Sequence, residues 1–242
     1  MKINKPILIV LGEPNSVFIE ILSKVLNKDN FKKKSKNPII LIGSKKLINS
    51  QLKKLKKNIK FRIIEFVNNK LPKLKNDIYL LDVKYKFTKP FESISAKSKN
   101  YISKSFEIGL KIINLKLSNL LINGPISKKY FLNYKYPGIT EYIFKKSDIE
   151  NSKKPVMLIF NKEFSVSPIT THISLKEVPK NINKEIIASN IEEINEFYKT
   201  KLNIKPRIAV LGLNPHCESK FKNNEERLKI IPANKKLKKR NI

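Results

Sequence analysis

The 242-residue chain is poor in several residue types, and each scarcity limits what it can be. It has one cysteine, Cys217, so no internal disulfide can form and nothing calls for an oxidising compartment. Lysine or asparagine interrupts every apolar run well before the roughly 18–20 residues that a membrane-spanning helix needs. The short apolar run 7–11 leads into Glu13 and Pro14, which predicts a first strand and not a signal peptide. We therefore expect a cytoplasmic protein without a membrane span.

Acidic residues and arginine are also scarce. The chain has 20 acidic and 51 basic residues, a formal net charge of +31, but only four arginines. Lysine (47), isoleucine (36) and asparagine (27) dominate, and all three have A/T-rich codons, so a biased genome explains the composition. The lysines are spread along the chain, and scarce arginine argues against base readout. These observations disfavour a nucleic-acid partner, although a basic nucleic-acid-binding α/β protein stays a third alternative, and the cationic field favours small anionic substrates.

Strand and helix patterns alternate along the chain, which is typical of an α/β fold. Several expected strands are continuous apolar runs, as in a parallel sheet covered on both faces. In one expected helix Phe106, Leu110 and Ile113 recur at helical spacing, which predicts core positions. The expected strands are 6–11, 38–43, 59–67, 77–83, 119–123, 155–161, 164–167 and 206–213, and the expected helices are 16–26, 45–56, 92–115, 184–202 and 224–237.

Short polar motifs follow several of these strands, where ligands of open α/β sheets bind. Two of them, at 11–14 and 123–128, contain a glycine that allows a tight turn or a close approach to a ligand, and a simple turn is the plainer interpretation of each. In a third motif, 137–141, Thr140 is expected to cap a short helix over 141–146. The site is therefore expected at these loops.

Both histidines of the chain end short polar motifs that follow an expected strand. His172 ends the segment Ser167–His172 and His216 ends the segment Gly212–His216, each directly after an expected strand. A lone histidine is more often structural, but two imidazoles converging on one cleft suit a divalent metal ion such as Zn²⁺ or Co²⁺. Two ligands are too few for a structural zinc site. A third ligand must come from elsewhere in the chain or from another subunit.

Together these motifs resemble the 4-hydroxythreonine-4-phosphate dehydrogenase family of pyridoxal phosphate biosynthesis, over essentially the whole chain. The resemblance implies an α/β fold like that of isocitrate and isopropylmalate dehydrogenases, with two α/β/α domains and an interdomain cleft. We assign the two domains to residues 1–124 and 125–242. The family resemblance also implies a homodimer with shared active sites. It implies His172 and His216 as ligands of a divalent metal (Zn, Co, Mg or Mn), and Thr140 as a contact of the substrate phosphate.

The implied reaction uses NAD to oxidise the 3-hydroxyl of 4-phosphooxy-threonine. The resulting β-keto acid then loses carbon dioxide and yields 3-amino-2-oxopropyl phosphate, a step of pyridoxine 5'-phosphate biosynthesis. A metal ion at the hydroxyl would lower its pKa and hold the enolate that forms. NAD is implied by the resemblance alone, because the chain has no Gly-x-Gly-x-x-Gly fingerprint.

The chain departs from the family pattern at three places. Ile139 stands where the family has a histidine, so one possible donor to the phosphate is missing. Residues 15–20 lack the family's glycine-rich turn. In the family a further segment follows, with the third metal histidine, a substrate-binding lysine and arginine, and much of the dinucleotide site. We therefore expect a C-terminally truncated chain with uncovered strand edges and apolar faces. The alternative function is a non-catalytic remnant that binds a phosphorylated metabolite or a partner subunit.

Overall fold

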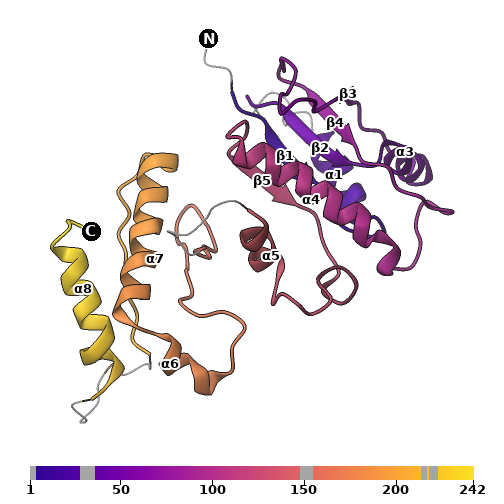
Figure 1. Cartoon of the computed structure of the whole chain (residues 1–242). Coiled ribbons are helices and arrows are strands. Elements are labelled where there is room, and N and C mark those ends of the chain that lie inside the picture. Colours follow the sequence, from indigo (N-terminus) through magenta and orange to yellow (C-terminus); the bar gives the residue numbers. More distant parts are fainter. Residues whose placement is uncertain (1–3, 28–35, 148–154, 214–216, 218–222) are drawn as a thin grey trace. The chain divides into compact units, whose positions relative to one another are not determined.

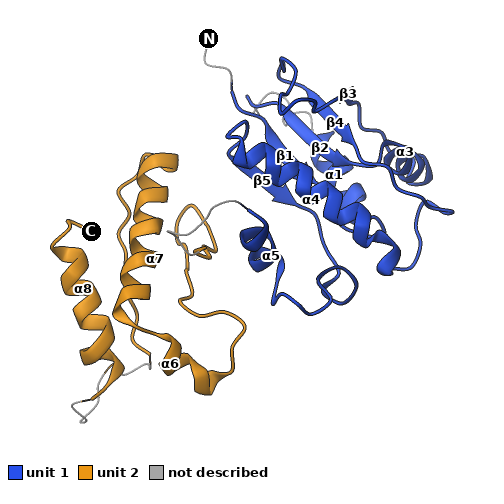
Figure 2. Cartoon of the chain, in the orientation of Figure 1, with its two compact units in different colours: residues 1–153 blue, residues 154–242 orange. Residues whose placement is uncertain are grey.

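The computed structural model describes residues 4–27, 36–147, 155–213, 217 and 223–242. These residues form two compact units, 1–153 and 154–242 (Figures 1 and 2). The expected domain boundary between residues 124 and 125 lies inside the first unit and stays a prediction.

The first unit is built on a five-stranded parallel sheet with the strand order β3-β4-β2-β1-β5. Each strand falls within one of the first five predicted strand segments, so the predicted α/β class with a parallel sheet is confirmed. The central strands are buried on both faces, as their continuous apolar sequences indicated. The strands are β1 (Ile7–Val10), β2 (Ile39–Gly43), β3 (Arg62–Ile64), β4 (Ile78–Asp82) and β5 (Leu120–Asn123).

Helices cover both faces of this sheet because side chains alternate along each strand. Ile9 and Leu41 belong to one apolar cluster, with residues of α1 (Phe18–Leu26) and α3 (Lys45–Lys54). Val10 and Ile42 point to the other face and belong to a second cluster, with residues of α4 (Lys99–Asn114) and α5 (Ile139–Lys146). The carboxyl ends of all five strands therefore share one edge between two helical layers.

An aromatic cluster joins α4 to α5. Phe106 of α4 is fully buried, with its ring centroid 5.9 Å from Phe131 and 5.7 Å from Tyr142 of α5. Leu110 is buried and Ile113 partly buried, so the predicted core stripe of this helix is confirmed. The helix begins later than predicted, at Lys99 instead of residue 92, after a short 3-10 turn at 96–98. The cluster also fixes a π-helical turn at 128–132.

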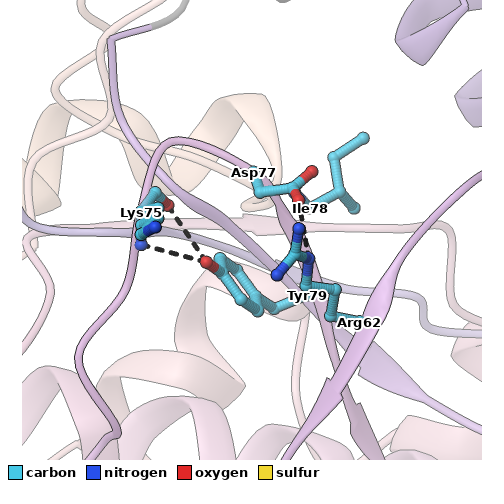
Figure 3. A network of polar contacts seen from close by, with 5 residues as sticks. All are labelled: Arg62, Lys75, Asp77, Ile78 and Tyr79. Atoms are coloured by element: carbon cyan, nitrogen blue, oxygen red, sulfur yellow. Dashed lines mark hydrogen bonds and ion pairs between the residues drawn. The ribbon is translucent and has the colours of Figure 1, made fainter.

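A polar network ties the outer strand β3 and the segment before β4 together (Figure 3). Arg62 Nε lies 3.0 Å from Asp77 Oδ2, and Asp77 Oδ1 accepts a hydrogen bond of 2.8 Å from the backbone N–H of Ile78. The Tyr79 hydroxyl accepts from the Lys75 backbone N–H at 2.9 Å and donates to the Lys75 carbonyl at 3.3 Å. These contacts hold the chain where no helix connects β3 to β4.

The second unit is helical and has a small core. Its main helices are α6 (Val178–Asn181), α7 (Lys184–Phe197) and α8 (Ile231–Lys238), and π-helical turns at 198–202 and 226–230 adjoin α7 and α8. Asn183 caps α7, because its Oδ1 accepts a 2.8 Å hydrogen bond from the N–H of Ile186. Six buried residues form the core between α7 and α8. In the described part of the chain no helix is long and apolar enough to cross a membrane.

Three predicted strands of this unit are wrong. The segments 155–161, 164–167 and 206–213 form no strand, and only one antiparallel bridge joins Ile159 to Val166. A strand exists only when a neighbour shares its backbone hydrogen bonds, and the described residues place no partner strand beside these segments. Their apolar side chains are accordingly exposed, with Ile159 at 57% and Leu211 at 82%. The described residues of the second unit therefore do not form the expected α/β/α domain.

Candidate functional site

Two glycines bring the loops after β1 and β5 into direct contact. The Glu13 backbone N–H donates to the Pro125 carbonyl at 2.7 Å. Gly12 has a φ of +72°, and a Cβ there would lie 2.3 Å from the Pro125 oxygen. A Cβ at Gly124 would lie 2.2 Å from the carbonyl oxygen of Leu11. These glycines serve a contact between two loops, which favours the plainer interpretation of both motifs as turns.

Glu13 is a buried charged residue at the carboxyl edge of the sheet, with an exposed fraction of 3%. Ser98 donates its hydroxyl to Glu13 Oε2 at 2.9 Å, and the Asn15 backbone N–H donates to Oε1 at 3.2 Å. Burial raises the pKa of the Glu13 carboxyl, and the two hydrogen bonds oppose that shift. The side chain thus joins the turn after β1 to the turn that precedes α4. Sequence analysis singled out the 11–14 motif that contains Glu13 but gave Glu13 itself no role.

Hydrogen bonds hold the segment 83–95 at the carboxyl edge of the sheet. Gln51 of α3 donates its side-chain amide to the carbonyl of Pro14 at 2.6 Å and to that of Pro90 at 2.9 Å. The backbone N–H of Glu92 donates to Asn15 Oδ1 at 2.9 Å. The cavity lined by Glu13 and Gln51 measures about 20 Å³, which is space for about one water molecule. It is too small for a dinucleotide or a phosphorylated substrate.

Glu92 gives this segment a measurable pH dependence. Its Oε1 accepts hydrogen bonds from the N–H of Lys89 and from the hydroxyl and N–H of Thr88, which lower its pKa to about 2. Because the folded pKa lies below the ordinary value of 4.5, the stabilisation is complete above pH 4.5 and is lost as the pH falls towards 2. A carbon NMR titration of the side-chain carboxyl should give a midpoint near 2, and a higher one in Thr88→Val. A wild-type midpoint near 4.5 would contradict this.

Thr140 is exposed in the first turn of α5, in the first unit. The prediction that it caps this helix is wrong, because α5 begins at Ile139 and its N-cap is Gly138. Gly138 adopts an extended conformation (φ −157°, ψ −177°) and has no side chain to cap the first backbone N–H groups. The helix therefore presents its N-terminus and the Thr140 hydroxyl without a capping side chain.

Glu141 is the neighbour of Thr140 and was not singled out from the sequence. Its Oε2 is buried and accepts no hydrogen bond within the described residues. A buried carboxylate oxygen without a hydrogen-bond donor is costly to the folded state. The sequence signal was its place in the 137–141 motif, but only the structure shows the buried oxygen.

The predicted metal ligands are placed only in part. His172 is exposed in a loop of the second unit and has a φ of +57°. His216 lies outside the described residues. Among the residues that the structure describes, no three histidine, cysteine, aspartate or glutamate side chains gather into a metal-binding group. The described residues alone therefore do not form a metal site.

Comparison with known proteins identifies the family. The family model "Pyridoxal phosphate biosynthetic protein PdxA" matches residues 34–242. The chain belongs to the PdxA family. A 4-hydroxythreonine-4-phosphate dehydrogenase of Sulfurihydrogenibium sp. is 35% identical over 233 residues, 95% of this chain and 69% of that protein. A dehydrogenase of the same name from Aquifex aeolicus is 29% identical over 243 residues, 99% of this chain and 72% of that protein. The family resemblance noted from the motifs is confirmed.

Solved structures share the PdxA fold. A 4-hydroxythreonine-4-phosphate dehydrogenase from Burkholderia phymatum matches with a TM-score of 0.78 and 23% identity, over 98% of this chain and 72% of that one. The enzyme of that name from Klebsiella pneumoniae matches with a TM-score of 0.79 and 21% identity, over 99% and 73%. The expectation that the chain belongs to an enzyme family, one of oxidoreductases, is confirmed by these PdxA relatives.

Proposed function

We propose that this chain acts as a 4-hydroxythreonine-4-phosphate dehydrogenase in pyridoxal phosphate biosynthesis. It oxidises the 3-hydroxyl of 4-phosphooxy-threonine with NAD, and the β-keto acid loses carbon dioxide to give 3-amino-2-oxopropyl phosphate. The observation that carries the proposal is the 35% identity to a dehydrogenase of this name over 95% of the chain. NAD is the hydride acceptor in this reaction. The soluble substrate and the single cysteine support a cytoplasmic location.

The phosphate of the substrate is assigned to the start of α5. The first N–H groups of a helix carry partial positive charge and have no intrahelical acceptor, so they bind anions. Gly138 leaves this end without a side-chain cap, and the Thr140 hydroxyl adds a donor in the first turn. Ile139 donates only through its backbone N–H. The phosphate therefore depends more on Thr140 than it would with a histidine at residue 139.

The remaining parts of the proposal rest on the family resemblance. His172 and His216 are two of the ligands of a divalent cation, and the third comes from outside the described residues or from a partner subunit. The active chain is a homodimer with domains at 1–124 and 125–242. The exposure of His172 supports its availability to a cation.

The test is formation of NADH by the purified chain with synthetic 4-phosphooxy-threonine, followed by absorbance at 340 nm. Carbon dioxide should be released in equal amount to NADH, since oxidation precedes decarboxylation. D-Threonate 4-phosphate serves as the competing substrate, because a relative from Bradyrhizobium diazoefficiens, 29% identical over 126 residues, is named a putative dehydrogenase of that compound. A folded chain that binds the phosphate ester but forms no NADH would contradict the proposal and favour a binding remnant.

Thr140→Val is expected to raise KM by about 10- to 150-fold and to leave kcat nearly unchanged. Valine keeps the shape of threonine but removes one hydrogen bond to a charged phosphate, which is worth about 1.5–3 kcal/mol. The measurement is the NADH assay over a range of substrate concentrations. Thr200→Val is the matched control, because Thr200 lies in the second unit and donates to the Glu196 carbonyl. Equal effects of the two substitutions would remove Thr140 from the phosphate site.

A further inference from the structure

Glu13 is a buried carboxylate to which the proposed reaction gives no role. It lies in the turn after β1, and only 3% of its surface is exposed. The cavity beside it has space for about one water molecule, so the substrate cannot reach the carboxylate. Most of the other side chains that line this cavity are apolar, among them Leu11 and Ile48. An apolar side chain would suit these surroundings, so stability alone does not explain a carboxylate here.

No basic side chain compensates the charge of Glu13. The chain has 51 basic residues, yet none of the ion pairs between described residues includes Glu13. Its oxygens accept hydrogen bonds from the Ser98 hydroxyl and from the backbone N–H of Asn15. Burial raises the pKa of the Glu13 carboxyl, which means that its ionisation destabilises the folded chain. A buried acidic group of this kind points to a role other than stabilisation.

Ser98 connects the Glu13 carboxylate to the start of α4. Ser98 is the N-cap residue of α4, where a serine hydroxyl usually accepts a hydrogen bond from an N–H of the first turn. Its side chain makes no such cap bond. The hydroxyl is instead directed to Glu13 Oε2 at 2.9 Å, and the Ser95 carbonyl is a second acceptor at 3.0 Å. The carboxylate therefore lies near the N-terminal end of α4, where the helix dipole favours negative charge.

α4 is also the helix against which α5 packs. The Phe106 ring of α4 lies 5.7 Å from the Tyr142 ring of α5, and the Tyr142 hydroxyl is hydrogen-bonded to Ser103 of α4. Thr140 lies in the first turn of α5, two residues before Tyr142. A regular helix moves as a rigid element, so a displacement at the start of α4 is carried to the first turn of α5.

We propose that Glu13 is a positioning residue for the substrate phosphate. Its carboxylate fixes the start of α4 through Ser98, and α4 in turn fixes the first turn of α5. This inference rests on the proposed phosphate site at Thr140, and Glu13 itself does not touch the substrate. Without the carboxylate, α5 occupies several positions, and only the fraction of molecules in the right one binds the phosphate.

The first test is calorimetric titration of the full chain with 4-phosphooxy-threonine, without NAD. Glu13→Leu should weaken binding about tenfold, because fewer molecules hold α5 in the binding position. Glu13→Gln should weaken it less than about threefold, since the amide can accept from Asn15 and donate to Ser98. Glu20→Gln is the matched control, an exposed carboxylate on α1 of the same unit, and should bind normally. Equal binding by Glu13→Leu and the control would overturn the proposal.

Hydrogen exchange separates positioning from a general loss of stability. In Glu13→Leu the backbone amides of residues 139–143 should exchange at least about fivefold faster than in the wild type, while those of β2 keep their rates. Unchanged exchange in α5, or equally faster exchange throughout the unit, would contradict the inference. The measurement needs no substrate. A wild-type chain that binds no phosphate ester would therefore contradict the proposed function, and exchange in α5 would still decide the role of Glu13.

Ser98→Ala tests the same contact from its other side, and it applies even if Glu13→Leu does not fold. It should weaken binding of the phosphate ester about as much as Glu13→Leu does. The double variant should bind no more weakly than either single variant, because the two side chains act through one contact. Additive losses, or normal binding by Ser98→Ala, would show that Glu13 does not act through α4.

Discussion

Gly124→Ala is expected to destabilise the first unit by about 3–5 kcal/mol, near the upper end of what single substitutions cost. The new Cβ would lie 2.2 Å from the carbonyl oxygen of Leu11, and backbone cannot move aside as a side chain can. Relief requires the ends of β1 and β5 to separate, which breaks the hydrogen bond from Gly124 N to Val10 O. Urea denaturation, followed by tyrosine fluorescence, gives the free energy of unfolding. Seven of the eight tyrosines lie in the first unit, so this signal reports on it.

Gly43→Ala is the control for this result. A Cβ at Gly43 would also be crowded, at 2.5 Å from Leu11 Cδ1 and 2.9 Å from the Tyr101 hydroxyl, but both neighbours are side-chain atoms. Leu11 can change its rotamer, so the expected loss is about 1–2 kcal/mol. Equal losses for the two alanine variants would show that the backbone contact between the two loops does not limit this edge of the sheet.

Phe106→Ala is expected to cost the first unit about 3–5 kcal/mol, as for other large-to-small substitutions in cores. Phe106 has no exposed surface and contacts both Phe131 and Tyr142, so its removal leaves a cavity between α4 and α5. Phe106→Leu keeps most of the volume and should cost less than about 1.5 kcal/mol. The same denaturation experiment measures both.

Phe106→Ala should also weaken substrate binding at the candidate phosphate site. Tyr142 belongs to α5, whose first turn contains Thr140, and the aromatic cluster is what holds this helix against α4. KM for the phosphorylated substrate should therefore rise in Phe106→Ala and stay close to wild type in Phe106→Leu. An unchanged free energy of unfolding in the alanine variant would show that the cluster is not part of the core.

The sheet of the first unit was predictable because its pattern is strong and its partners are local. Strands such as 39–43 are continuous apolar runs, and each finds its neighbours within the same unit. The segments 155–161 and 206–213 have similar sequences but no partner strand in the described part of the chain. Whether an apolar run becomes a strand depends on a second segment, and one-dimensional patterns do not contain that information.

The candidate site was predictable in its residue types more than in its geometry. The motif around Thr140 and its family were recognised, but the helix begins at Ile139 with Gly138 as its N-cap, so the capping position lies two residues before the predicted one. The buried carboxylate of Glu13 accepts a hydrogen bond from Ser98, which is distant in sequence, and the sequence pattern does not contain that contact. The contact between the loops of Gly12 and Gly124 likewise depends on both loops, so neither motif alone predicts it.

The small core of the second unit has a consequence for the lifetime of the chain in a cell. In the described part of the chain, six buried apolar residues form the core of that unit, against two larger clusters in the first, so we expect it to open more often. Each opening exposes lysine-rich segments to proteases, and the rate of degradation follows the equilibrium population of the open state. A ligand or partner that binds the second unit would therefore raise the steady-state amount of the whole protein without any change in its synthesis.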